Sequence, residues 1–249
     1  MLITGRAAIT ITITIMQVTA MTTSHNPGLY RLLTWLSPSY PVGAFSYSQG
    51  LETAIARGLV QDTASLQAWI ESSLSGGTLW SDAVLFACAH EAAPVAGSSS
   101  LSEVVEFAAA FQPSAELRLE TMAQGDAFLK VTRQAWPCGA LEKLMRIRRR
   151  DIAYPVAVGC AAAGHGIGLN AALEAWVHAS VSNLVSAAIR LVPLGQTQGQ
   201  EVLASVEPAI ADVVELAQQT LLCDIATNSF VAEICSMQHE TQTTRLFRS

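Results

Sequence analysis

The feature of this sequence that most constrains its fold is a long run of apolar side chains at helical spacing. Residues 169–192 read LNAALEAWVHASVSNLVSAAIRLV, and the large apolar residues stand three, four or seven positions apart. That period aligns them along one face of an α-helix. Glu174, His178 and Arg190 interrupt the run, which argues against a membrane span, and Pro193 ends it. The pattern predicts a long buried helix.

Most of the remaining chain also has the composition of helices. Apolar residues make up 51% of the sequence, and stretches with Pro or Gly separate the periodic segments. Asp62 stands where it can cap a helix that begins at Thr63. We find no linker long enough to separate the chain into several domains. We therefore predict one all-α domain over residues 28–249, with about eight to ten packed helices and a functional C-terminal tail.

The first 27 residues stand apart from this pattern. The string AITITITI alternates with the period of a β-strand, and a loop-like stretch, TAMTTSHNPG, follows it. The apolar part is too short for a membrane span and too rich in threonine for a signal peptide. An isolated strand has no partner to stabilise it. We therefore predict that residues 1–27 are a flexible extension, or that translation starts at Met16 or Met21.

The charge and cysteine patterns exclude several classes of protein. The net charge of −6 argues against nucleic-acid binding. The basic cluster RIRRR, residues 146–150, fits either a solvated helix end or a patch for an anion or acidic partner. The five cysteines form no CxxC pair and the five histidines are dispersed. We therefore expect a reduced, cytoplasmic protein without disulfides, a bound metal or a cofactor.

Motifs of catalysis are missing as well. The sequence contains no P-loop, no GxSxG and no HExxH. We therefore expect a binding or scaffolding protein that is not an enzyme and does not bind membranes. Two other classes stay open from the residues alone: an enzyme or regulator of another pathway built on the same helices, and a protein that uses its apolar N-terminus at a membrane surface.

Three segments carry a functional signal. In SPSYPVGAFSYSQGLE, residues 37–52, two prolines stiffen a loop that either packs its rings inward or presents itself to a partner. In residues 183–200, three glutamines follow the long helix and suit a polar turn or an interface. In HETQTTRLFRS, residues 239–249, Leu246 and Phe247 stand between two arginines. This tail either folds into the core of the chain or contacts another protein.

These three strings, together with ELRLETMAQGDAFL and YPVAVGCAAAGHGIG, closely resemble the urease accessory protein UreF family. The resemblance covers residues 29–249 in the order of the family. It implies an all-α accessory protein that helps to insert nickel into apo-urease and has no chemistry of its own. It also implies that the chain forms a homodimer, bridges UreD (UreH in some organisms) and the GTPase UreG, and gates that GTPase.

The resemblance assigns candidate contact residues as well. For UreD/UreH, we expect contacts from the tail: His239, Glu240, Gln242, Arg245, Leu246, Phe247 and Arg248. For UreG or the homodimer, we expect contacts from the 37–52 loop, the long helix and the glutamines that follow it: Pro38, Tyr40, Pro41, Gly43, Tyr47, Glu52, Arg190, Gln196 and Gln200. No residue is assigned a catalytic, metal-binding or cofactor-binding role.

Overall fold

The computed structural model describes residues 26–94 and 99–249, and over these residues it contains helices and no strand. This confirms the all-α prediction, although short helices divide the chain more finely than we expected. Two 3-10 helices, Ala44–Ser46 and Leu222–Asp224, lie among the α-helices. The α-helices are α1 (Pro27–Trp35), α2 (Leu51–Ala56), α3 (Thr63–Gly76), α4 (Thr78–Ala92), α5 (Ser99–Ala110), α6 (Ala115–Ala135), α7 (Gly139–Ile147), α8 (Tyr154–Gly164), α9 (Leu169–Leu191), α10 (Gln196–Ser205), α11 (Glu207–Ala217) and α12 (Phe230–His239).

Helix α1 begins inside the segment that we predicted to be an extension. The side chain of Asn26 accepts a hydrogen bond from the backbone N–H of Leu29 (3.1 Å), and Pro27 occupies the first turn. Both residue types favour a helix start at these positions. Asn26 and Pro27 therefore belong to the helical domain. The rest of that prediction, residues 1–25, lies outside the described residues.

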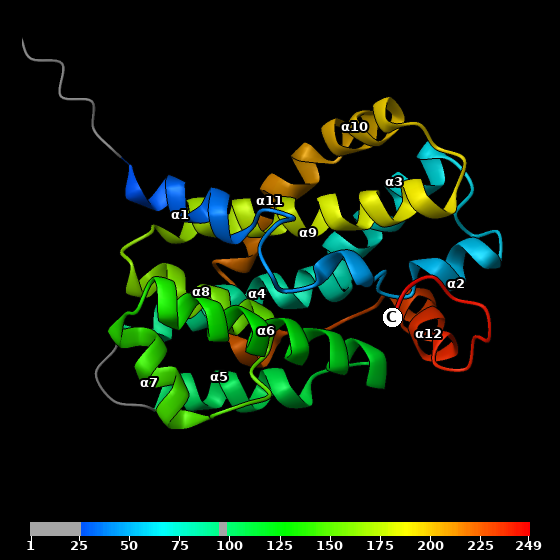
Figure 1. The fold of residues 1–249 in the computed structure, drawn as a ribbon. Coiled ribbons are helices and arrows are strands. Elements are labelled where there is room, and N and C mark those ends of the chain that lie inside the picture. The colour runs from blue at the N-terminus through cyan, green and yellow to red at the C-terminus, as the bar shows by residue number, and fades with distance from the viewer. Residues whose placement is uncertain (1–25, 95–98) are drawn as a thin grey trace, which may run out of the picture.

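The core is built around α4 and α8, which lie side by side in the middle of the molecule (Figure 1). Helix α8 carries no side chain larger than valine from Val156 onward, and nearly all of these residues are buried. The small side chains let α4 approach closely, since a Cβ atom on Gly159 would lie 2.6 Å from the carbonyl oxygen of Phe86. A helix that is apolar all round must be covered on every side, and α6, α7 and α9 supply that cover.

The predicted long helix is α9, and it crosses the molecule beside this pair (Figure 1). It ends two residues before Pro193, and its apolar stripe, which includes Leu173 and Trp176, is buried as predicted. The predicted cap of α3 is also confirmed, because the Asp62 carboxylate accepts from the backbone N–H of Ser65 (2.8 Å). Within residues 26–94 and 99–249, we find no helix with the length and hydropathy needed to cross a bilayer.

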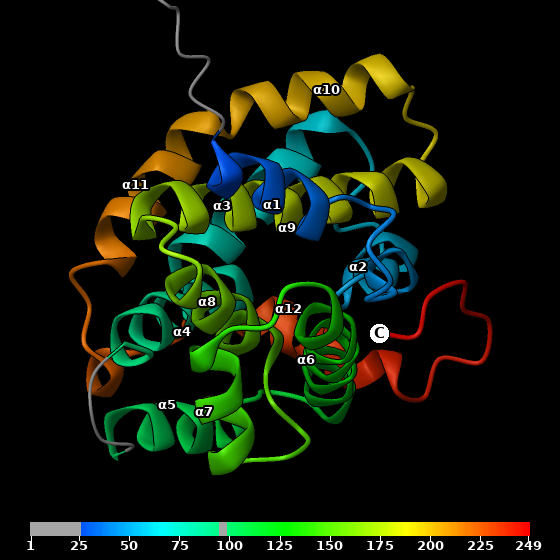
Figure 2. The ribbon, with the colours of Figure 1, turned by 60° about the vertical axis from the view of Figure 1, so that its left-hand side comes forward.

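The last helix packs against one of the first. Helix α12 contacts α2, and the chain then loops out at the edge of the molecule and returns between α2 and α6 (Figures 1 and 2). Gly50, directly before α2, permits this contact. Its φ is +80°, and a Cβ atom there would lie 2.8 Å from the backbone nitrogen of Ser236 in α12. Glycine alone meets both conditions without strain.

Replacing Gly50 by alanine should lower the free energy of unfolding by more than about 1 kcal/mol, because the new methyl group meets the α12 backbone while φ stays positive. Chemical denaturation followed by circular dichroism measures this loss. Gly166→Ala is the matched control, since Gly166 has a φ of +67° but open space around its Cβ position. If both variants lose the same stability, close helix approach is not what requires glycine at position 50.

Candidate functional site

The residues after α12, 240–249, form a tail that is fixed to the body of the protein. The carbonyl oxygen of Ser249 accepts from the backbone N–H (2.9 Å) and the hydroxyl (2.5 Å) of Ser48. The hydroxyl of Ser249 in turn donates to Glu120 on α6 (2.6 Å). One residue earlier, the backbone N–H of Arg248 donates to the carbonyl oxygen of Ser46 (2.9 Å). The tail is thus held by the turn before α2 and by α6.

The carboxylate of Glu52 on α2 holds the middle of the tail. It accepts from the backbone N–H groups of Leu246 (2.6 Å) and Phe247 (2.9 Å), and it also forms a hydrogen bond with Nε2 of His239 (3.0 Å). Glu52 is itself buried. Charge-assisted bonds to a buried carboxylate are stronger than neutral ones, so this side chain is the main anchor of the tail.

The imidazole of His239 lies between two carboxylates. Its Nδ1 is 2.6 Å from a Glu116 oxygen, its Nε2 bonds to Glu52, and its side chain is fully buried. These two contacts fix the orientation of the ring between α2 and α6. Arg245 adds a cation, because its Nη1 donates to the other Glu116 oxygen (2.8 Å). We call Glu52, Glu116, His239 and Arg245 the charge cluster.

The ring of Phe247 packs on this chain. It is 2% exposed, and the guanidinium of Arg190 lies 4.3 Å from its centroid. Arg190 also donates to the carbonyl oxygen of Phe45 (2.8 Å). A cation over an aromatic face is attracted to its electrons, so Arg190 both covers Phe247 and fixes the neighbouring turn. We predicted that the tail either folds into the core of the chain or contacts another protein, and Phe247 folds into the core.

Much of the 37–52 segment lies beneath the tail or inside the core. Tyr47 is buried and faces Arg248, whose guanidinium is 5.8 Å from the ring centroid. Tyr40 is also buried, and its hydroxyl bonds to that of Thr132 (2.7 Å). Together with Glu52, these two side chains cannot contact a partner directly in this conformation. The exposed part of the segment consists of Pro38, Ser39, Pro41, Gly43 and Phe45.

The structure therefore joins two predicted contact regions and leaves a third apart. The tail, the turn before α2 and Arg190 form one continuous site. Gln242 and Glu240 strengthen it by accepting from the Thr53 hydroxyl (2.9 Å) and from the backbone N–H of Ala115 (3.1 Å). In contrast, Gln196 and Gln200 are exposed on α10, and no hydrogen bond links them to the tail.

An apolar surface remains exposed beside this site. Leu246 is 63% exposed, although its backbone is anchored to Glu52. On α12, four large apolar side chains at helical spacing are also about half or more exposed: Phe230, Val231, Ile234 and Met237. We call these four the α12 stripe. Apolar side chains gathered on one helix face are typical of protein–protein contacts.

Sequence comparisons decide the family. The sequence model of the UreF family matches residues 60–207. The "Urease accessory protein UreF" of Rhodopseudomonas palustris (strain BisB5) is 48% identical over 229 residues, which are 92% of this chain and 94% of that protein. The chain belongs to the UreF family. The protein of the same name from Bradyrhizobium sp. (strain BTAi1) is 47% identical over 230 residues, 92% of this chain and 95% of that protein. As their name states, these relatives are urease accessory proteins, and UreF is a family of accessory proteins rather than of enzymes.

Sequence reasoning missed the acceptors on which the UreF tail depends. Glu116 and Glu120 lie four residues apart on α6, and Gln124 follows after another four. All three are buried. Polar residues at a strict spacing of four share one helix face. Three of them on a helix inside a single compact domain indicate a buried polar surface that binds another segment of the chain. That periodicity was the available signal.

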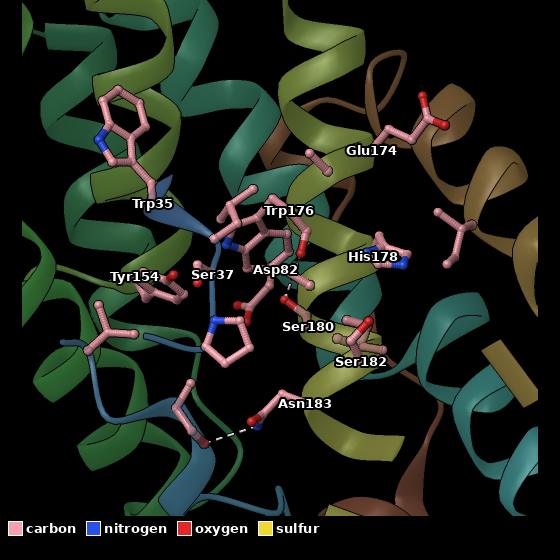
Figure 3. Close-up of a pocket in the computed structure, with 18 of the residues that line it drawn as sticks. Trp35, Ser37, Asp82, Tyr154, Glu174, Trp176, His178, Ser180, Ser182 and Asn183 are labelled. Atoms are coloured by element: carbon pink, nitrogen blue, oxygen red, sulfur yellow. Dashed lines mark hydrogen bonds between the residues drawn. The ribbon is translucent and has the colours of Figure 1, made fainter. Parts of the chain in front are cut away.

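A large cavity lies next to the tail seat of this UreF chain, by which we mean the residues of α2, α6 and the turn before α2 that hold the tail. It has a volume of about 1140 Å³, and its wall includes Asp82, Glu120, Tyr154 and Trp176 (Figure 3). Burial, and to a smaller extent the charge of Glu120, raises the pKa of Asp82 to about 8. Burial likewise raises the pKa of Glu120 to about 7, against the lowering effect of its hydrogen bonds from Ser249 and two glutamines. The cavity therefore holds two carboxyl groups that resist ionisation.

Glu52→Ala should free the tail, because the N–H groups of Leu246 and Phe247 and the His239 ring lose their acceptor. Trypsin cleavage after Arg245, followed by mass spectrometry, should be about tenfold faster or more, given the strength of hydrogen bonds to charged groups. Glu240→Ala is the control, since Glu240 is exposed and accepts a single bond from Ala115. Equal cleavage rates in both variants would mean that Glu52 does not anchor the tail.

The stability of the protein should fall as the pH rises from about 4 to about 8. Asp82 stays protonated in the folded state up to its raised pKa of about 8 but ionises near 3.8 in the unfolded chain, so ionisation favours unfolding in this window. Asp82→Asn cannot ionise and should unfold at least about 1 kcal/mol less readily than the parent at pH 8. Denaturation curves across this pH range test the prediction, with the exposed Glu174→Gln as control. An unchanged pH dependence in Asp82→Asn would contradict it.

Proposed function

We propose that this chain acts in urease maturation as a non-catalytic scaffold. It binds UreD/UreH, recruits the GTPase UreG, gates that GTPase and so couples it to nickel insertion into apo-urease. The names and the 46–48% identity of its relatives support the role in urease maturation. All five cysteines are free, which supports a cytoplasmic location for this work.

The observation that carries the proposal is that the α12 stripe and Leu246 leave five large apolar side chains exposed in the C-terminal region. A buried leucine or phenylalanine side chain contributes roughly 1.5–3 kcal/mol when a partner removes it from water. Five such side chains on one C-terminal region therefore support a stable contact. We assign this surface to UreD/UreH.

The charge cluster supports the same assignment. A disordered tail would lose conformational entropy on binding, whereas a tail already fixed by Glu52 and Glu116 has lost it on folding. Arg248 and Leu246 are then held outward in a defined geometry, with Arg248 able to bond to acceptors of the partner. In this proposal His239 and Phe247 act indirectly, by shaping the tail.

A second surface is our candidate for UreG or for a second copy of the chain. It consists of the exposed part of the 37–52 segment, from Pro38 to Phe45, and of Gln196 and Gln200 on α10. Amide groups and apolar rings lose less hydration energy than charged groups when an interface covers them. Because this surface and the α12 stripe lie on different elements, one chain can bridge two partners.

Leu246→Asp and Ile234→Asp should each weaken the complex with UreD/UreH by about tenfold or more, since a charge would enter an apolar contact. The measurement is size-exclusion chromatography with light scattering on the full chain mixed with UreD/UreH and UreG of its organism. Both side chains are exposed, so the variants should fold normally, which circular dichroism checks. Deleting the tail is a poorer test, because Glu52 would lose two backbone donors and Glu116 would lose Arg245.

The matched control is Leu216→Asp, which places the same charge on α11 at a leucine that is 55% exposed. It should co-elute with UreD/UreH like the parent chain. If all three variants bind equally well, the α12 stripe and Leu246 are not the UreD/UreH contact. If the parent chain itself fails to bind UreD/UreH and UreG, the scaffold function is wrong.

A further inference from the structure

The cavity beside the tail seat contains a carboxyl group without a partner. Asp82, on α4, is 8% exposed, and its side chain forms no hydrogen bond or ion pair with any described residue. It nevertheless lines the cavity, where Figure 3 shows it near Trp176. Native proteins rarely leave a buried carboxyl group unsatisfied. The Asp82 carboxyl group is therefore available to accept a hydrogen bond from a ligand in the cavity.

A second carboxyl group in the same wall lacks a cation. Glu120 accepts from the side chains of Gln49 (3.2 Å), Gln124 (3.1 Å) and Ser249 (2.6 Å), and all three donors are neutral. Neither Glu120 nor Asp82 forms an ion pair with a described lysine, arginine or histidine. A cation inside the cavity would therefore favour the ionisation of both carboxyl groups and pair with the charges that form.

The unsatisfied acceptors and the rings of the wall indicate what kind of cation fits. Besides the Asp82 carboxyl group, Oε1 of Gln49 is buried without a donor. The rings of Tyr154 and Trp176 line the same cavity, with centroids 6.4 Å apart. An alkylammonium group offers three N–H donors to separate acceptors and is attracted to aromatic faces. Nε1 of Trp176 also lacks a partner, and a water molecule beside the ligand can accept from it.

The arrangement suits a metal ion less well. In residues 26–94 and 99–249, no three histidine, cysteine, aspartate or glutamate side chains come close enough together to hold one. With fewer such side chains, most of the coordination shell of a divalent metal would be left to water or backbone oxygens. A primary ammonium group does not, because each of its N–H bonds can reach a different wall of the cavity.

We propose that this cavity binds a small organic cation with a primary ammonium group, with Asp82 as its principal acceptor and Glu120 as a second negative charge. The volume of about 1140 Å³ leaves room for an alkyl chain beside the aromatic wall. Glu174 also lines the cavity, and its side chain is exposed. This inference does not depend on the proposed role in urease maturation.

Binding should strengthen with pH. The ammonium group pairs best with ionised Asp82, and the pKa of Asp82 is raised to about 8, so affinity rises as the pH increases from 6.5 toward 8.5. Other titratable groups that line the cavity are Tyr40, Glu120, Tyr154, Glu174, His178 and Glu207. Glu120 changes charge in the same direction near pH 7, and both changes favour the cation.

Isothermal titration calorimetry of the full chain with butylammonium, at pH 6.5 and 8.5, tests the site. Butanol is the neutral analogue, and Mg²⁺ and Ni²⁺ are the metal probes. We expect saturable binding of butylammonium that is tighter at pH 8.5, and none of butanol. Asp82→Asn should weaken binding by about tenfold or more, because a charged hydrogen bond is lost. Glu174→Gln, which removes the same charge at the rim, should bind within about twofold of the parent.

Two results would overturn the proposal. If butylammonium does not bind, the cavity holds water only. If butylammonium binds equally well to Asp82→Asn, its binding site does not include Asp82. If Mg²⁺ or Ni²⁺ binds with one-to-one stoichiometry and depends on Asp82, the cavity is a metal site instead. Circular dichroism of Asp82→Asn confirms that it is folded.

As a second test, Tyr154→Phe keeps the ring and should leave butylammonium affinity unchanged, whereas Trp176→Leu should reduce it.

Discussion

The position of the tail depends on the charge cluster. Glu52 and Glu116 are buried, and their hydrogen bonds with His239, Arg245 and the backbone of the tail satisfy them there. These partners come from the end of α12 and from the tail, so the two acids and the tail stabilise one another. Ser48 and Ser249 extend the same network toward α6 with neutral hydrogen bonds. The surface that we assign to UreD/UreH therefore has its shape fixed from beneath.

The sequence predicted those parts of the fold that depend on local chemistry. The period of residues 169–192 located α9, and the cap at Asp62 located the start of α3. Each of these signals consists of residues that are close together in the sequence. The predicted start of the domain at residue 28 lies two residues after Asn26, which caps α1. The arrangement of the site could not be predicted in the same way. Whether Glu116 would meet His239 depends on how α6 and α12 pack, which no local pattern specifies.

The candidate site also combines segments that the sequence presented separately. The tail and the 37–52 loop looked like contacts for two different partners, yet Glu52, Tyr47 and the turn at Ser46 support the tail directly. Part of the similarity to UreF in the 37–52 loop thus has a structural reason. Glu120 connects this seat to the cavity, because one of its oxygens accepts from Ser249 while its side chain lines the cavity wall. Glu120 thus belongs both to the residues that hold the tail and to the wall of the cavity.

The bond between Glu52 and His239 has a consequence for folding kinetics. The two residues are 187 positions apart in the chain, so their contact closes a loop that contains most of the domain. The entropy lost on closing a loop rises only slowly with its length, but contacts between such distant residues slow the search for the native state. Before His239 docks, the carboxylates of Glu52 and Glu116 lack one of their buried partners. We therefore expect docking of α12 and the tail to be a late step of folding, after α4, α8 and α9 have assembled.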